Sequence, residues 1–215
     1  MRITEFVWAI LPALLWLLYF YKQDRLPEPP RIVFRVFVFG ALAVIPAAII
    51  ESRFISNLGR HTPVVSSLLL NYGVIAVAEE LSKLVGLIIG VGKSKAIDSG
   101  VDGLVYGVSA GLGFAMLENI LYINSFGVQV APVRAIFSNL AHALFTGVMG
   151  YYYAHSLLWD RKKEFWKGIL WAILLHGTYN FILISGLISP VWSIVLLVVA
   201  FSRVSGVFRR QRNIS

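Results

Sequence analysis

Residues 71–90 read NYGVIAVAEELSKLVGLIIG, an apolar run with three charged side chains near its centre. A helix that crosses a bilayer needs about 20 predominantly apolar residues. An ionisable side chain in the middle of such a helix costs several kcal/mol unless it is paired or solvated. This stretch therefore predicts a transmembrane helix in which Glu79, Glu80 and Lys83 have a structural or functional task.

The rest of the 215-residue chain has the same apolar character. Hydrophobic residues make up 58% of it and charged residues 14%, whereas an average soluble domain has about 25% charged residues. A soluble chain of this length cannot bury so much apolar surface in one core, so the composition indicates a polytopic membrane protein. The absence of cysteine excludes a disulfide framework, a thiolate nucleophile and a cysteine-based metal site.

Seven apolar segments are long enough to cross a bilayer, which predicts an all-α bundle of about seven transmembrane helices. They lie near residues 4–22, 32–51, 63–90, 101–123, 131–156, 166–186 and 190–208. The first has no small-residue cleavage site and is therefore predicted to be retained. The proline-rich stretch DRLPEPPR at 24–31 predicts an extended loop. We expect residues 1–215 to form a single transmembrane domain.

The basic residues predict how the chain is oriented. Of the 19 lysines and arginines, 14 lie in one alternate set of loops and Lys83 lies inside a span. The opposite set of loops holds only Arg2, Arg53, Arg60 and Arg134. By the positive-inside rule the amino terminus is outside and the carboxyl terminus is in the cytoplasm. The net charge of +8 is explained in this way, and no nucleic-acid partner is expected.

The charges of the third span suggest a catalytic base. Glu79 and Lys83 are four residues apart on one helical face, so they are predicted to pair. That pair leaves Glu80 unmatched, which makes Glu80 the first choice for the base and Glu79 the alternative. A purely structural ion pair between helices is the competing interpretation. It requires only one carboxylate, so it does not explain why the span contains two.

The fourth span begins with acidic residues and continues with a glycine stripe. Gly103, Gly107 and Gly111 recur every four residues, which predicts the close approach of another helix, either from this chain or from a second copy. Asp98 and Asp102 stand at the start of the helix, where carboxylates suit the helix dipole, and they are predicted to cap it.

Further polar side chains lie inside the fourth, fifth and sixth spans. They are Glu118, His142, His176 and Asn180, the last of these one turn after His176 on the same face. At 1.5 Å per residue the two histidines come near mid-membrane, and Glu118 lies somewhat nearer the outer face. A lone buried histidine is usually a satisfied hydrogen-bonding group, but two histidines and three glutamates at similar depth favour a functional site.

Carboxylate, imidazole and amide groups can hydrolyse a peptide bond in two ways. A buried glutamate can take a proton from the attacking water while histidine and asparagine stabilise the developing charges. Alternatively, His142, His176 and Glu118 can bind a divalent metal such as zinc, and a remaining glutamate is then the base. The spacing does not decide between them, because the residues come from four separate helices. A proton-coupled transporter and a non-catalytic membrane scaffold are the competing functions.

These polar segments resemble the PrsW family of intramembrane proteases, within the wider group of CAAX-processing proteases. The similar blocks are YFYKQDRLPEPP at 19–30, EELSK at 79–83, DGLVYGVSAGLGFAMLENILY at 102–122, VRAIFSNLAHALFTGVMGYY at 133–152 and LLHGTYNFI at 174–182. By this resemblance, the family's paired glutamates, its FxxxE glutamate, its fifth-helix histidine and the ends of its HxxxD/N motif correspond to Glu79 and Glu80, Glu118, His142, and His176 and Asn180. The resemblance implies that these six residues are catalytic.

The resemblance also implies a function and a location. It predicts a multi-pass protein of a bacterial cell membrane that cleaves a single-span membrane protein within the lipid bilayer. The family's described role is the first (site-1) cut of a membrane-bound anti-sigma factor near the outer side, as part of envelope-stress signalling. We therefore expect an anti-sigma factor as the substrate.

Overall fold

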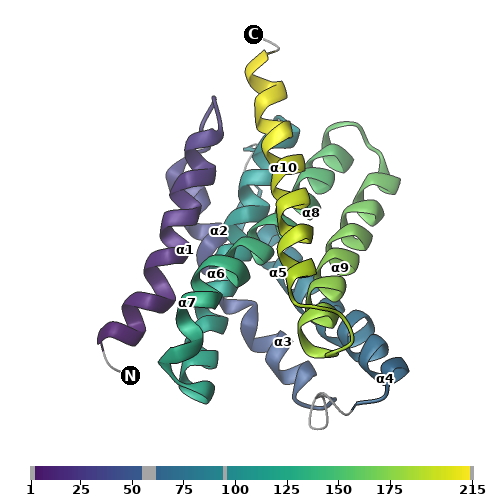
Figure 1. The fold of residues 1–215 in the computed structure, drawn as a ribbon. Coiled ribbons are helices and arrows are strands. Elements are labelled where there is room, and N and C mark those ends of the chain that lie inside the picture. Colours follow the sequence, from purple (N-terminus) through teal and green to yellow (C-terminus); the bar gives the residue numbers. More distant parts are fainter. Residues whose placement is uncertain (1–2, 55–61, 94–95, 214–215) are drawn as a thin grey trace.

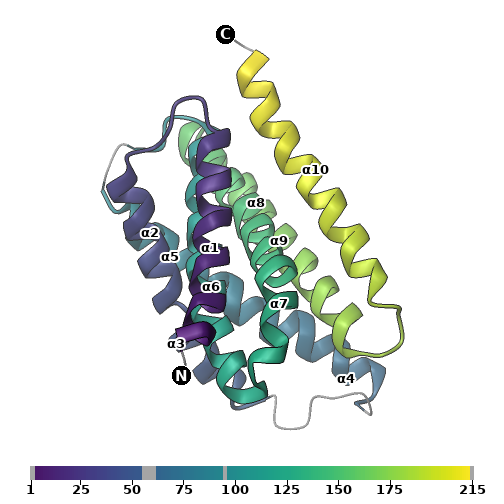
Figure 2. The same ribbon diagram turned by 60° about the vertical axis from the view of Figure 1, so that its left-hand side comes forward.

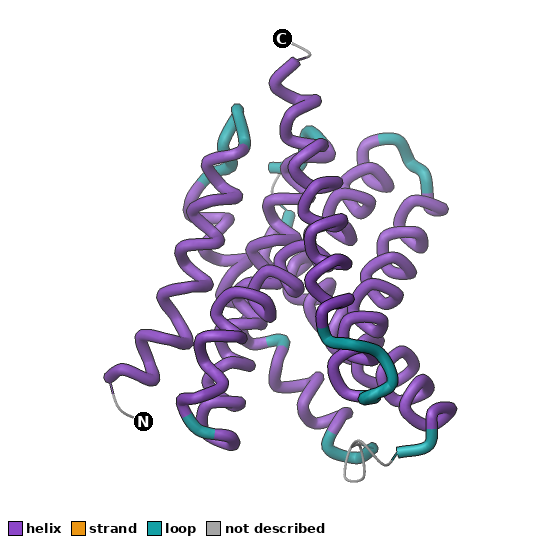
Figure 3. Tube along the Cα trace, viewed as in Figure 1, coloured by secondary structure: helices purple, strands orange, loops and turns teal. Residues whose placement is uncertain are grey.

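The computed structural model describes residues 3–54, 62–93 and 96–213. Within these residues the chain is helical and has no strand, so the predicted all-α polytopic bundle is confirmed (Figures 1 and 3). Arg2 and Arg60, which entered the prediction of orientation, lie outside the described residues.

Each of the seven predicted spans corresponds to one helix or to consecutive helical segments. The segments are α1 (Ile3–Gln23), α2 (Pro30–Leu42), α3 (Val44–Glu51), α4 (Val64–Leu68), η1 (Leu69–Ile75), α5 (Ala76–Val91), α6 (Gly100–Phe126), η2 (Val128–Val130), α7 (Ala131–Val133), η3 (Arg134–Ser138), α8 (Asn139–Leu158), α9 (Lys162–Ile184) and α10 (Val191–Asn213). Five stretches in the described part of the chain are long and apolar enough to cross a membrane as continuous helices: α1, α2 with α3, α6, α9 and α10.

Three spans are interrupted for identifiable local reasons. The second span breaks after Leu42 because Pro46, four residues later, has no N–H to bond to the Leu42 carbonyl. The third and fifth spans each contain a π-helical segment, η1 and η3. Such segments insert one residue into a helical turn and are frequent at functional sites.

The most enclosed element is α6, which packs against α8 through its glycines. A Cβ atom at Gly103, Gly107 or Gly111 would collide with the backbone carbonyl of Gly150, Thr146 or His142, respectively. The predicted close approach is therefore confirmed, and it is internal to the chain, which resolves the alternative of a second copy. At the start of α6, Ser99 is the N-cap and Asp102 completes a capping box with it. Of the two predicted capping residues, Asp102 therefore takes part in the cap, whereas Asp98 lies before the N-cap residue.

The two ends of the chain lie at opposite ends of the bundle (Figures 1 and 2). The start of α1 and the α9–α10 connection are at the lower end in Figure 1, and the end of α10 and the α8–α9 connection are at the upper end. This arrangement agrees with an odd number of crossings. Large apolar side chains such as Leu15, Trp171 and Val198 are exposed on α1, α9 and α10, as expected for a surface that faces lipid.

Candidate active site

Polar side chains from several helices line a cavity of about 380 Å³ in the lower half of the bundle. Five of the six predicted site residues contribute to its wall: Glu79, Glu118, His142, His176 and Asn180. The helices that carry them are α5, α6, α8 and α9. Residues separated by about 100 positions in the sequence thus meet at one place.

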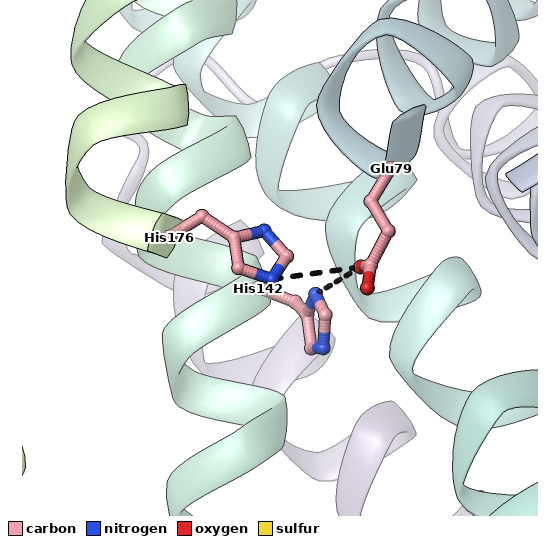
Figure 4. A group of neighbouring side chains, drawn as sticks. All are labelled: Glu79, His142 and His176. Carbon is pink, nitrogen blue, oxygen red and sulfur yellow. Dashed lines mark ion pairs between the residues drawn. The ribbon is translucent and has the colours of Figure 1, made fainter. Parts of the chain in front are cut away.

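Glu79, His142 and His176 form the closest group (Figure 4). Oε2 of Glu79 is 3.8 Å from Nδ1 of His142 and 3.7 Å from Nε2 of His176. One potential ligand atom from each of the three lies within 4.8 Å of the others. The predicted metal-binding set contained Glu118, whereas the closest group of potential donor atoms among the described residues contains Glu79.

Lys83 forms hydrogen bonds with three side chains of the site. Its Nζ donates to Oε2 of Glu79 at 3.0 Å, to Oε1 of Glu80 at 2.8 Å and to Nδ1 of His142 at 2.9 Å. All three N–H groups of the ammonium are used. The prediction that Glu80 is left unmatched is therefore wrong, because residues three apart on a helix are neighbours just as residues four apart are.

Glu80 lies behind the cavity wall and is fully buried. Besides Lys83, it accepts hydrogen bonds from Oγ1 of Thr146 at 2.9 Å and from Nδ1 of His176 at 2.7 Å. Nδ1 of His176 bonds to Glu80, and Nε2 of the same ring faces Glu79 at 3.7 Å. Glu80 is thus placed to orient His176, whereas Glu79 lines the cavity.

Glu118 is held from a different side. Its Oε2 forms an ion pair with Arg134 and lies 3.0 Å from Nε2 of His142. Because Lys83 can only donate to Nδ1 of His142, the proton of that ring is on Nε2 and is donated to Glu118. Nε of Arg134 also donates to the Asn119 side chain at 2.7 Å.

Two π-helical segments, η1 and η3, each directly precede a helix that carries a site residue. The η1 segment ends four residues before Glu79, and η3 ends four residues before His142. A π-helical turn interrupts the regular backbone hydrogen bonds of an α-helix. Close to each of the two segments, an asparagine side chain donates a hydrogen bond to a backbone carbonyl. Nδ2 of Asn71 donates to the carbonyl of Ser67 at 2.7 Å, and Nδ2 of Asn139 donates to that of Ala135 at 3.0 Å.

Some site residues were not anticipated from the sequence. Glu51, at the end of α3, lines the cavity and has a buried Oε1 without a hydrogen-bond partner in the described part of the chain. Glu51 is the last residue of a predicted span, and a carboxylate at that position was the sequence feature that could have marked it as a site residue. Nothing in the sequence marked Thr146 as a site residue, since a threonine in an apolar helix usually bonds to its own backbone.

Asn180, a predicted site residue, lines the cavity, and its side chain makes no hydrogen bond within the described residues.

The donor atoms of the closest group fit a zinc ion. Two imidazole nitrogens and one carboxylate with an open position are a catalytic zinc set, and a carboxylate behind one histidine is its usual support. Within the hydrogen-bonded network, three carboxylates, at Glu79, Glu80 and Glu118, face two cations, at Lys83 and Arg134. Carboxylates outnumber cations there, and the Glu51 carboxyl also lines the cavity, so a bound cation would offset buried negative charge. Lys83, however, already contacts two of the donor atoms.

Comparison with known proteins agrees with these features. The pattern of one family, described as PrsW family intramembrane metalloprotease, matches residues 28–205. A relative named Protease PrsW from Oceanobacillus iheyensis is 36% identical over 177 residues, which cover 81% of this chain and 80% of the relative. Proteins of the same name from Bacillus subtilis (37% over 180 residues, 81% and 80% covered) and Clostridioides difficile (31% over 208 residues, 93% and 86% covered) are also similar. No solved structure matches the chain significantly.

Proposed function

Because the chain belongs to the PrsW family of intramembrane proteases, we propose that it hydrolyses a peptide bond of a single-span membrane protein beside Glu79, His142 and His176. The observation that carries this proposal is the convergence of these three side chains on one cavity inside a membrane-spanning bundle. Polar side chains on part of the cavity wall, Glu118 and Asn180 among them, would hold the water for hydrolysis.

The proposed division of labour follows from the contacts. Glu79 takes the proton of the attacking water, since it lines the cavity whereas Glu80 does not. The side-chain amide of Asn180 donates to the developing oxyanion, because it also lines the cavity and has no other hydrogen bond among the described residues. Glu80 orients His176, and Glu118 with Arg134 orients His142.

A metal ion changes one of these roles. Glu79, His142 and His176 would hold zinc, which supplies a Lewis acid for the carbonyl and a water of lowered pKa. With Glu79 as a ligand, Glu118 and Glu51 are the carboxylates that remain on the cavity wall, and we assign the proton transfer to Glu118 because it contacts His142 at 3.0 Å. The contact of Lys83 with the same donor atoms favours the metal-free arrangement, and the surplus negative charge favours the metal.

The position of the cavity bears on the substrate. Its wall includes the ends of α3 and α9, at the end of the bundle where α1 begins. The positive-inside rule predicts that this end is outside the cell. We propose that the cut lies near the outer side of the membrane and that, as the family resemblance implies, the substrate is a membrane-bound anti-sigma factor. We also propose that residues 1–215 act as one protease domain.

The test is cleavage of a single-span substrate by the purified full-length protein in detergent, with and without a chelator, and with bound metal measured on the same sample. Glu79→Gln is expected to lower kcat by about 10²- to 10⁴-fold, because it removes a base or a ligand. Glu164→Gln is the matched control, since the ion pair that Glu164 forms among the described residues is with the exposed Lys167, at 2.8 Å.

The outcomes separate the two arrangements. Stoichiometric zinc with chelator-sensitive activity that zinc restores makes Glu79 a ligand, whereas full activity without metal makes it the base. Undiminished cleavage by Glu79→Gln would contradict both. Absence of cleavage by the unmodified protein would favour a non-catalytic scaffold, and flux driven by a pH gradient in vesicles would favour a transporter.

A further inference from the structure

Three carboxylates are buried together at the end of the bundle opposite the active-site cavity. Asp24 and Glu28 come from the loop between α1 and α2, and Asp102 comes from the first turn of α6. Their exposed fractions are only 5%, 6% and 3%. One oxygen from each lies within 4.8 Å of the others. Buried carboxylates need hydrogen-bond donors, protons or a cation, because an isolated buried charge is very costly.

Hydrogen bonds account for part of the group only. Asp102 is satisfied by Ser99 and by the backbone N–H groups of residues 98 and 99, and Glu28 accepts from the Tyr106 hydroxyl. Asp24 accepts with Oδ1 from Leu26 N at 3.0 Å and from Nε2 of Gln211 at 3.1 Å. Its Oδ2 is enclosed and has no partner in the described part of the chain, and the same holds for Oε1 of Gln211.

No basic side chain is recorded in contact with this group among the described residues. The nearby Arg35 is committed elsewhere, since its guanidinium donates to the carbonyls of Gly90 and Val91 at the end of α5. Three carboxylates packed this closely repel one another unless protons or a counter-charge join them.

We propose that Asp24, Glu28 and Asp102 bind a hard divalent cation, Mg²⁺ or Ca²⁺, with Gln211, whose side chain contacts Asp24, as a further ligand. A set made only of oxygen atoms suits these ions, whereas the two imidazoles of the active-site group suit zinc. The unpartnered oxygens of Asp24 and Gln211 are the groups that such an ion would satisfy. The proposal also gives a task to the stretch YFYKQDRLPEPP at 19–30, which does not line the active-site cavity.

The consequence of binding is structural. The ion would connect the α1–α2 loop to the start of α6 and to the end of α10, through Asp24, Asp102 and Gln211. These three elements are far apart in the sequence, and α6 carries the glycine stripe and Glu118. Because binding stabilises only the folded state, the melting temperature should depend on the concentration of the cation.

The experiment measures thermal unfolding of the full-length protein in detergent, stripped with EDTA and titrated separately with Mg²⁺ and Ca²⁺. We expect a saturable rise in Tm of roughly 5–10 °C at a hundredfold excess over Kd for one of the ions. Calorimetry should give one ion per chain. Asp24→Asn is expected to lose the shift while folding normally, since it removes a charge from a repulsive group. Glu28→Gln is the second variant if Asp24→Asn does not fold.

Two controls make the result specific. Glu164→Gln should keep the full shift, because Glu164 lies outside the group. Glu79→Gln should also keep it, which separates this site from the active-site donors and makes the test independent of proteolysis. The proposal is overturned if neither ion raises Tm or if Asp24→Asn and Glu28→Gln respond as the unmodified protein does. A response to only one ion identifies which of the two is bound.

Discussion

At the scale of the residue, Lys83 organises the candidate active site. It is fully buried, and its ammonium contacts Glu79, Glu80 and His142 and lies 4.1 Å from the centre of the Phe114 ring. A buried ammonium is tolerated only with such compensation. Its charge keeps both carboxylates close together, and its three donated hydrogen bonds fix which nitrogen of His142 carries the proton.

The two adjacent glutamates are expected to respond differently to substitution. Glu80→Gln should lower the free energy of unfolding by about 3 kcal/mol, because it weakens a fully buried network that includes Lys83, Thr146 and His176. Glu79→Gln should cost less stability, since Glu79 faces the cavity. Thermal unfolding of both variants in the same detergent checks this order. Equal stability of Glu80→Gln and the unmodified protein would show that Glu80 has no orienting role.

At the scale of the element, contact between α6 and α8 fixes where His142 stands. The carbonyl of His142 occupies the space that a side chain at Gly111 would need. The helix axes can approach this closely only because glycine has no Cβ. The π-helical segment η3, which precedes α8, changes which face of the fifth span points inward, and so helps to direct the imidazole toward the cavity.

Gly111→Ala is expected to push α8 away from α6. We expect a loss of about 1–3 kcal/mol in stability from overpacking and a larger proportional loss in cleavage, because His142 moves with α8. Gly206→Ala is the matched control, since no described atom lies within 4 Å of the position its Cβ would take. Thermal unfolding and cleavage are measured on both. A Gly111→Ala variant as stable and active as Gly206→Ala would show that the close approach is dispensable.

At the scale of the whole molecule, the orientation predicted from the basic residues can be tested directly. The chain has no cysteine, so an introduced cysteine is its single thiol. Leu187→Cys lies in the exposed α9–α10 connection and should react with a membrane-impermeant maleimide on intact cells. Lys163→Cys, at the start of α9 and at the opposite end of the bundle, should react only after permeabilisation. The reverse pattern would place the active-site cavity toward the cytoplasm.

The fold class and most of the residues that line the cavity's polar part were predictable from the amino-acid sequence. Apolar runs of bilayer length defined seven spans, because backbone polar groups in lipid must be bonded within a helix. Charged and imidazole side chains inside such runs are costly, so their presence marked Glu79, Glu80, Glu118, His142 and His176 as candidates. The glycine stripe likewise indicated a close helix contact, which the structure shows between α6 and α8.

How these side chains contact one another depends on the tertiary structure. Helical periodicity relates residues within one helix, and it did not separate the i,i+3 contact of Lys83 with Glu80 from its i,i+4 contact with Glu79. Contacts between helices, such as Arg134 with Glu118 and Thr146 with Glu80, depend on packing that no local pattern encodes. For this reason only the folded bundle showed that Glu79 faces the cavity while Glu80 lies behind its wall.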